Sequence, residues 1–164
     1  MTIESLVPGI IGAAVGVLGW LAVGIYIQRR QFLRQARSAA RAVYFELDVN
    51  RTALMVARDL GSFTALDRSS FERLLPELAT LLPAAELQTV VSAYMGHAGY
   101  QQASGDPQLP ASVRSQLLDA ILAAHDDALA VIRACAFSPA EAAALGTQGE
   151  EAVARPQPRR SPAR

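Results

Sequence analysis

The two imidazoles of the chain, His97 and His125, are the side chains best suited to proton transfer or metal binding. No HxxxH, HExxH or CxxC spacing accompanies them. A metal or hydrolytic site would need a third group from another segment, such as Glu46 or the single cysteine, Cys135. His125 also lies on the apolar stripe of the helix predicted for its own segment. We therefore expect packed histidines, with no metal, no cofactor and no enzyme activity. A membrane-bound metal-dependent or hydrolytic enzyme that uses His97 and His125 is the alternative.

A second chemical feature is a pair of polar residues, Glu46 and Asn50, one helical turn apart on an apolar stripe. A polar residue in such a seam often specifies register or partner number at a cost in stability. We expect Glu46 and Asn50 to form a buried polar pair that accepts hydrogen bonds from a neighbouring helix, with Tyr94 as a candidate donor. Partial exposure of both side chains to solvent is the alternative.

Other chemistries leave no pattern in the sequence. There is no glycine-rich phosphate loop followed by Lys and Ser or Thr, and no GxS nucleophile elbow. The net charge is zero, with 15 basic and 15 acidic residues, and aromatic residues do not alternate with basic ones. Nucleic acid is therefore not an expected partner.

The element that dominates the sequence is an uncharged segment of about 22 residues, Leu6–Ile27, long enough to cross a bilayer. No Lys or Arg precedes it, and Gln28-Arg29-Arg30 stands where a signal peptide would be cleaved. We expect an uncleaved anchor over residues 6–27, with residues 1–5 as a short extracytoplasmic N-terminus. Because arginines follow the segment and none precedes it, the rest of the chain is expected on the cytoplasmic side of the inner membrane.

Glycines recur within this segment at steps of three and four residues, which places them on one helical face: Gly9, Gly12, Gly16 and Gly19. Small residues let two helix backbones approach closely in lipid. The expected partner is therefore a second copy of the chain or another membrane protein. Glycine is also common in membrane helices without any such role.

Arginines crowd the residues that follow the segment: Arg29, Arg30, Arg34, Arg37 and Arg41. In an upright helix Arg34 lies about 10 Å beyond Ile27 and Arg41 about 20 Å beyond it. Screening acts over roughly 8 Å in physiological salt. We therefore expect Arg29, Arg30 and Arg34 to contact lipid headgroups. A topology signal with a solvated face, and a sensor of anionic lipid surfaces, are the alternatives.

The remaining residues predict an all-α fold in which the anchor continues into a helical bundle of three to four helices over residues 28–146. No proline or glycine interrupts Gln28–Leu60, and Gly61 is suited to a helix C-cap. Prolines and glycines divide the following residues into shorter helices, from about 69, 84 and 112. Residues 147–164, rich in Pro and Arg, are expected to be a disordered tail.

Local signals within the bundle give further expectations. Capping boxes are predicted at Ser69–Glu72 and at Ser138–Glu141. Pro76 is expected to break the second helix, and Gly96 with Gly99 to loosen the end of the third. Altogether the sequence predicts a single-pass membrane-anchored helical protein that acts through protein–protein interaction as an anchor, scaffold or regulator. A host–virus membrane factor is a specialised form of this hypothesis.

Overall fold

The computed structural model describes residues 7–145, with side chains described from Gly16 onward. Its labelled helices are α1 (Val7–Leu60), α2 (Ser69–Leu81), α3 (Ala84–Gly105) and α4 (Ala111–Ala136), and a further helical turn covers residues 139–145. No strand occurs among these residues, and the all-α prediction is confirmed. The predicted N-terminal segment 1–5 and the tail 147–164 lie outside the described residues.

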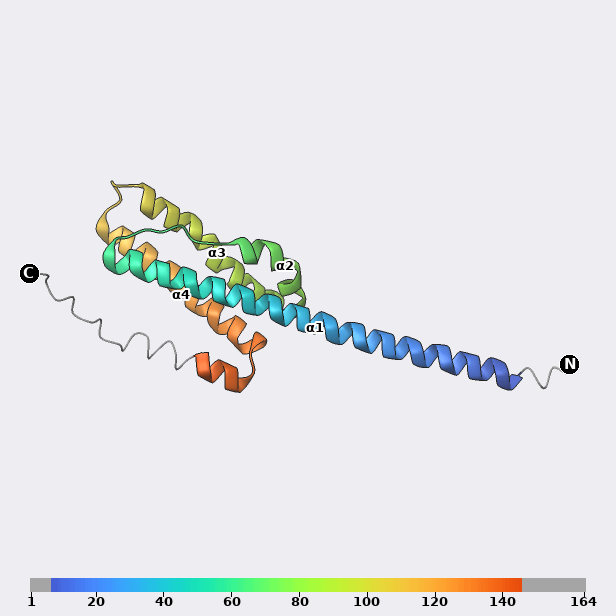
Figure 1. Cartoon of the computed structure of the whole chain (residues 1–164). Coiled ribbons are helices and arrows are strands. Elements are labelled where there is room, and N and C mark those ends of the chain that lie inside the picture. The colour runs from blue at the N-terminus through green and yellow to red at the C-terminus, as the bar shows by residue number, and fades with distance from the viewer. Residues whose placement is uncertain (1–6, 146–164) are drawn as a thin grey trace, which may run out of the picture.

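Helix α1 is a continuous rod of 54 residues whose C-terminal half packs in the bundle and whose N-terminal half projects from it (Figure 1). The predicted continuity of Gln28–Leu60 is confirmed. The helix ends at Gly61, which has a positive φ of 65° and donates its backbone N–H to the carbonyl of Ala57 at 3.0 Å. Glycine adopts this left-handed conformation without steric penalty.

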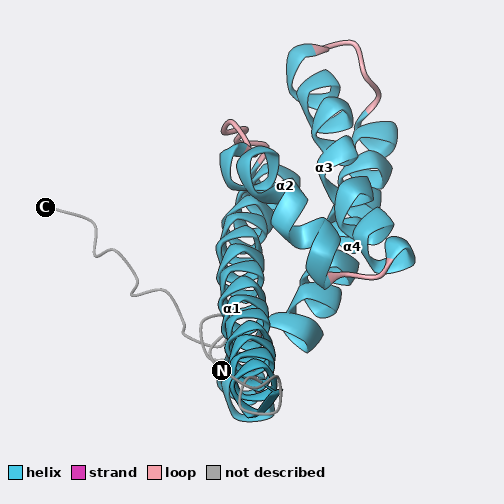
Figure 2. Ribbon diagram, turned by 90° about the vertical axis from the view of Figure 1, so that its right-hand side faces the viewer, coloured by secondary structure: helices cyan, strands magenta, loops and turns pink. Residues whose placement is uncertain are grey.

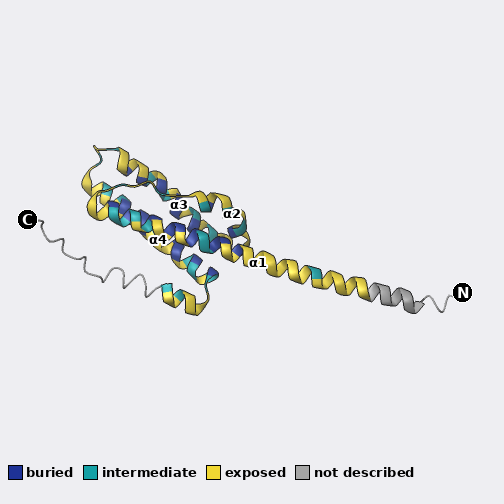
Figure 3. Ribbon diagram, viewed as in Figure 1, coloured by how far each residue is buried: buried dark blue, intermediate teal, exposed yellow. Residues whose placement is uncertain are grey.

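The projecting part of α1, residues 7–33, is called the arm below. Where its side chains are described, large apolar groups face solvent on every side: Trp20 is 78% exposed and Leu21 51% (Figure 3). The predicted span Leu6–Ile27 begins outside the described residues. Within the described part of the chain, no helix combines the length and the apolar character needed to cross a membrane.

The bundle is built on a buried stripe of α1 that repeats at steps of four and three residues: Ala36, Ala40, Val43, Leu47, Asn50, Leu54 and Ala57. Helix α4 packs against both α1 and α3, and α2 packs against α1 (Figure 2). The buried apolar residues form two clusters along the bundle. The first includes Leu47, Leu78 and Ile132. The second includes Leu54, Leu118 and Ile121.

One predicted helix boundary is wrong. Helix α2 continues through Pro76 instead of ending there. Proline lacks the N–H that would bond the preceding turn and crowds the carbonyl there. Pro76 lies on the exposed side of α2, where a carbonyl without a helical partner is open to solvent at little free-energy penalty.

Candidate functional site

The buried polar side chains of the bundle lie together where its two apolar clusters meet, with Glu46 and Tyr94 on the side of the first cluster. On α1, Asn50 falls between Leu47 and Leu54, which belong to different clusters. The same order holds on α3 and α4, where a histidine separates the two clusters. We call this set the polar layer: Glu46, Asn50, Tyr94, His97 and His125.

Glu46 caps helix α2 although it is distant from that helix in sequence. Its carboxylate accepts hydrogen bonds from the backbone N–H groups of Ser70 (2.5 Å) and Phe71 (3.2 Å), in the first turn of α2. The hydroxyl of Tyr94 donates to the same carboxylate at 2.7 Å. The expected hydrogen bond between α3 and Glu46 is therefore present. A negative charge at this end of α2 also complements the helix dipole.

Asn50 binds the connection between α1 and α2. Its amide nitrogen donates to the carbonyl of Asp67 at 2.6 Å, and its amide oxygen accepts from the backbone N–H of Asp67 at 2.9 Å. The side chain is only 2% exposed. Glu46 and Asn50 thus hold neighbouring parts of one connection, and each has its own partners there.

These contacts replace the capping box predicted at Ser69–Glu72, which is wrong. The carboxylate of Asp67 accepts from the backbone N–H groups of Arg68 (2.8 Å) and Ser69 (3.0 Å). Glu72 instead pairs with Arg68 at 2.6 Å. With Glu46 and Asp67 satisfying the first amides of α2, no donor is left for Glu72 to cap. The box at Ser138–Glu141 is confirmed by hydrogen bonds in both directions.

The imidazoles of His97 and His125 stack across the α3–α4 contact, with centroids 5.5 Å apart and planes 13° from parallel. His125 is fully buried, and its Nδ1 lies 2.9 Å from the carbonyl of Ile121, which requires a proton on Nδ1. Burial lowers the pKa of both rings, that of His97 to about 4, with the neighbouring His125 as the next cause. Nε2 of each ring is buried and has no hydrogen-bond partner. Both histidines are therefore neutral near pH 7.

Two glycines bring the histidines together. A Cβ added at Gly96 would lie 3.1 Å from a methyl carbon of Ile121, and one at Gly99 would lie 3.2 Å from a methyl carbon of Leu117. These positions are points of close approach between α3 and α4. The prediction that Gly96 and Gly99 loosen the end of the helix is wrong, because the absence of a side chain there permits tight packing.

The two-histidine metal site considered from the sequence does not assemble. Among the described residues, no group of three His, Cys, Asp or Glu side chains is placed to hold a metal ion. Cys135 is a partly buried side chain packed against the first apolar cluster, and burial raises the pKa of its thiol. The carboxylate of Glu46 is occupied by α2 and Tyr94.

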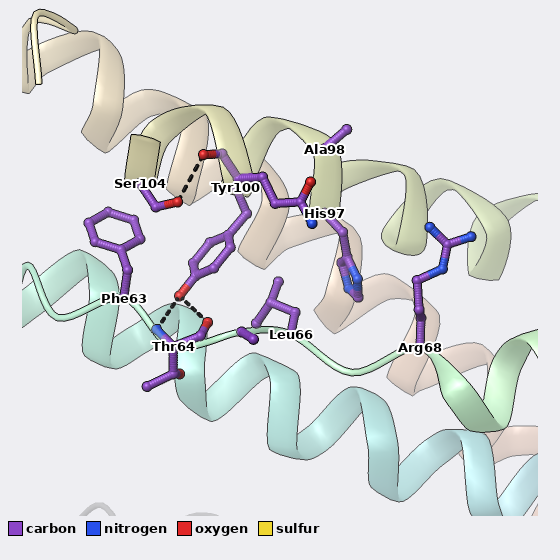
Figure 4. A pocket seen from close by; sticks show the side chains of 10 residues that line it. Phe63, Thr64, Leu66, Arg68, His97, Ala98, Tyr100 and Ser104 are labelled. Atoms are coloured by element: carbon purple, nitrogen blue, oxygen red, sulfur yellow. Dashed lines mark hydrogen bonds between the residues drawn. The ribbon is translucent and has the colours of Figure 1, made fainter. Parts of the chain in front are cut away.

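A cavity of about 330 Å³ opens beside the polar layer, between the 61–68 connection and α3 (Figure 4). His97 lines it, together with Arg68 and Tyr100. The hydroxyl of Tyr100 donates to the carbonyl of Thr64 at 2.9 Å and accepts from its N–H at 3.0 Å. Sequence reasoning missed this cavity, because its two walls are 36 residues apart at this bond and share no local pattern.

The arginines after the predicted span fall into two groups. Arg29, Arg30 and Arg34, the predicted lipid contacts, are exposed on α1. Arg41 instead binds the end of α4 and the turn that follows it: it donates to the carbonyl of Ala136 at 3.0 Å and pairs with Glu141 at 2.9 Å. Its guanidinium also lies 5.0 Å from the ring centroid of Phe137.

The predicted glycine face is described in part. A Cβ added at Gly16 or Gly19 would meet no other atom within 4 Å among the described residues. Gly9 and Gly12 lie outside the residues whose side chains are described.

Comparison with known proteins yields no relative. No protein-family model matches the chain, and neither a curated protein nor a solved structure is similar to it. Its function has to be argued from its own residues.

Proposed function

We propose that this chain is a single-pass membrane protein of the inner membrane that presents a helical bundle to a protein partner. The observation that carries the proposal is the arm of α1. Among the residues whose side chains are described, large apolar groups there are exposed all round the helix. A helix that is apolar on every face is typically buried in lipid or in a protein core. In sequence the uncharged stretch extends over Leu6–Ile27, enough to cross a bilayer when its first residues are included.

The arginines support one orientation of this anchor. Arg29, Arg30 and Arg34 follow the apolar stretch and are exposed, in position to meet anionic headgroups. The guanidinium of Arg30 also lies 5.2 Å from the ring centroid of Tyr26, an aromatic residue of the kind enriched at membrane interfaces. We assign the bundle to the cytoplasmic side and the N-terminus to the opposite side.

We also propose that the arm pairs with the arm of a second copy through Gly9, Gly12, Gly16 and Gly19. Gly16 and Gly19 have open space where a side chain would be, and packing within the chain gives no reason for glycine there. Close approach of two helices in lipid gives such a reason.

The arginines do not oppose this pairing. At about 100° per residue they continue the glycine face, and parallel rods would bring like charges together. Glycine-mediated pairs cross at about 40°, however, and Arg34 lies about 30 Å from the middle of the glycine face. The two helices are then about 20 Å apart at Arg34, beyond the screening length of roughly 8 Å.

Membrane insertion is tested by alkaline extraction of membranes that contain the full chain. We expect the chain to stay in the membrane pellet. Replacement of Leu18 and Leu21 by Arg adds about 5 kcal/mol or more to the free energy of insertion and should release it. Val49→Arg, which adds charge at an exposed site in the bundle, is the matched control and should stay in the pellet. Release of the unmodified chain would contradict the proposal.

Pairing of two arms is tested by measuring the dimer affinity of the full chain in detergent micelles by Förster resonance energy transfer between labelled copies. Gly16→Leu should weaken the dimer at least about tenfold, because it separates the backbones. Gly24→Leu is the control, since Gly24 lies about 100° from the middle of the glycine face and also has open space around it. Equal effects of the two substitutions would exclude pairing through this face.

The partner of the bundle is sought by crosslinking in native membranes. Under the proposal, an adduct with another membrane protein or with a second copy forms with the unmodified chain. The chain with Leu18 and Leu21 replaced by Arg, which stays outside the membrane, should lose that adduct. Its persistence would show that the anchor is not needed for the interaction.

A further inference from the structure

The cavity beside the polar layer has the size of a small-molecule site. Its volume of about 330 Å³ lies at the lower end of the range typical of ligand pockets. A molecule with a single ring fits this volume.

The walls of the cavity are held in place without a ligand. Tyr100 bonds both backbone groups of Thr64, and Asn50 bonds both backbone groups of Asp67. The 61–68 connection is thereby attached to α3 at one point and to α1 at another. A preformed site of this kind spares a ligand much of the entropic penalty of ordering the loop.

The charge of the lining favours an anion. Arg68 is the one charged side chain among the described residues that line the cavity. Its present partner is Glu72, at 2.6 Å, and both side chains are more than half exposed. Such an exposed ion pair contributes little free energy. A ligand carboxylate, which matches the guanidinium geometry, is able to take the place of Glu72.

His97 lines the same cavity from α3. It is 5% exposed, and its Nε2 has no hydrogen-bond partner. Figure 4 shows its imidazole reaching from α3 toward the connection, beside Leu66. Phe63 and the ring of Tyr100 pack against each other at 5.3 Å between centroids and form an aromatic wall at the end of the cavity away from Arg68 (Figure 4). The lining thus combines a flat apolar part with a cationic rim.

We propose that this cavity binds a small monocarboxylate with a flat apolar body. Arg68 pairs with the carboxylate, and the apolar body lies against Leu66, beside the imidazole of His97. The site joins the 61–68 connection and α3, so an occupied cavity ties these two segments more firmly together. Ligand binding here does not depend on the membrane proposal, and either one can fail alone.

The test uses benzoate as a probe and the full chain in detergent micelles. Because the chain has two histidines, the imidazole signals in an NMR spectrum are few and are assigned by single substitution. Benzoate should shift the His97 signals in a saturable manner. Benzamide, which has the same shape and no charge, should bind at least about tenfold more weakly. Absence of a saturable shift, or equal binding of the two probes, would overturn the proposal.

Three substitutions give the site its specificity test. Arg68→Gln should weaken benzoate binding at least about tenfold. Glu72→Gln should tighten it severalfold, because it frees Arg68 from its present partner. Arg73→Gln, at an exposed arginine of α2 outside the cavity lining, should leave it unchanged. Benzoate affinity that is insensitive to both Arg68→Gln and Glu72→Gln would place the probe elsewhere and contradict the proposal.

Discussion

At the scale of single residues, the bundle is organised by polar groups that find their partners far along the chain. Glu46 bonds backbone groups 24 and 25 residues away and a hydroxyl 48 residues away. Sequence periodicity placed Glu46 and Asn50 in a buried seam and singled out Tyr94 as a donor. It gave no hint that α2 is the main partner of Glu46, because the nearby Ser69–Glu72 spacing offered a local cap.

The contribution of Glu46 is measured by urea unfolding of the Glu46→Ala variant. This substitution leaves two amides of α2 and the hydroxyl of Tyr94 without their acceptor, and we expect a loss of about 2–4 kcal/mol. Glu72→Gln, which removes an exposed ion pair, should change stability by less than about 0.5 kcal/mol. Similar losses for the two variants would show that Glu46 is not a long-range cap.

The stacked histidines predict a pH dependence of stability. The folded state lowers the pKa of His97 from 6.5 to about 4 and also lowers that of His125. Below pH 6.5 the unfolded chain therefore binds more protons, and stability falls as the pH drops toward 4. From about pH 7 to about pH 5 we expect a loss of roughly 2 kcal/mol from His97 alone. Urea unfolding of His97→Gln should show a correspondingly weaker dependence, and an unchanged dependence would exclude His97 as the cause.

At the scale of elements, the local patterns predicted most of the helices. The four-three stripe of α1, the C-cap at Gly61 and the capping box at Ser138 all depend on residues within about a turn of one another. The predictions that were wrong concern features that depend on the tertiary structure. The solvent exposure of Pro76 lets α2 continue through it, and Gly96 is a contact with Ile121 instead of a weak end. The cavity lining could not be predicted, because its two sides come from separate segments.

The role of Arg41 depends on the helical elements that pack beside it. Although it belongs to the arginine series after the arm, it bonds the end of α4 and the turn over residues 139–145. Arg41→Gln should therefore speed amide hydrogen exchange in residues 139–145 severalfold, since that turn loses the ion pair between Glu141 and α1. Arg37→Gln removes a neighbouring arginine and should leave this exchange unchanged. Equal exchange rates in the two variants would show that Arg41 does not stabilise the turn and is a solvated arginine like Arg37.

At the scale of the whole molecule, one helix serves two environments. The same α1 contributes the buried stripe of the bundle and an arm whose described apolar side chains are exposed. The bundle has its own core and its own polar layer. The exposed apolar side chains of the arm, in contrast, need an apolar environment that the described part of the chain does not provide. A lipid bilayer is the surrounding that we propose.

The most direct test of this account uses the single tryptophan of the chain, Trp20, which lies in the arm and is 78% exposed. Its fluorescence is measured in the full chain reconstituted into vesicles whose lipids carry bromine at defined depths. If the arm crosses the bilayer, the emission is blue-shifted, and bromines near the bilayer centre quench it more strongly than those near the headgroups. An emission typical of water, with no quenching at any depth, would contradict the membrane anchor.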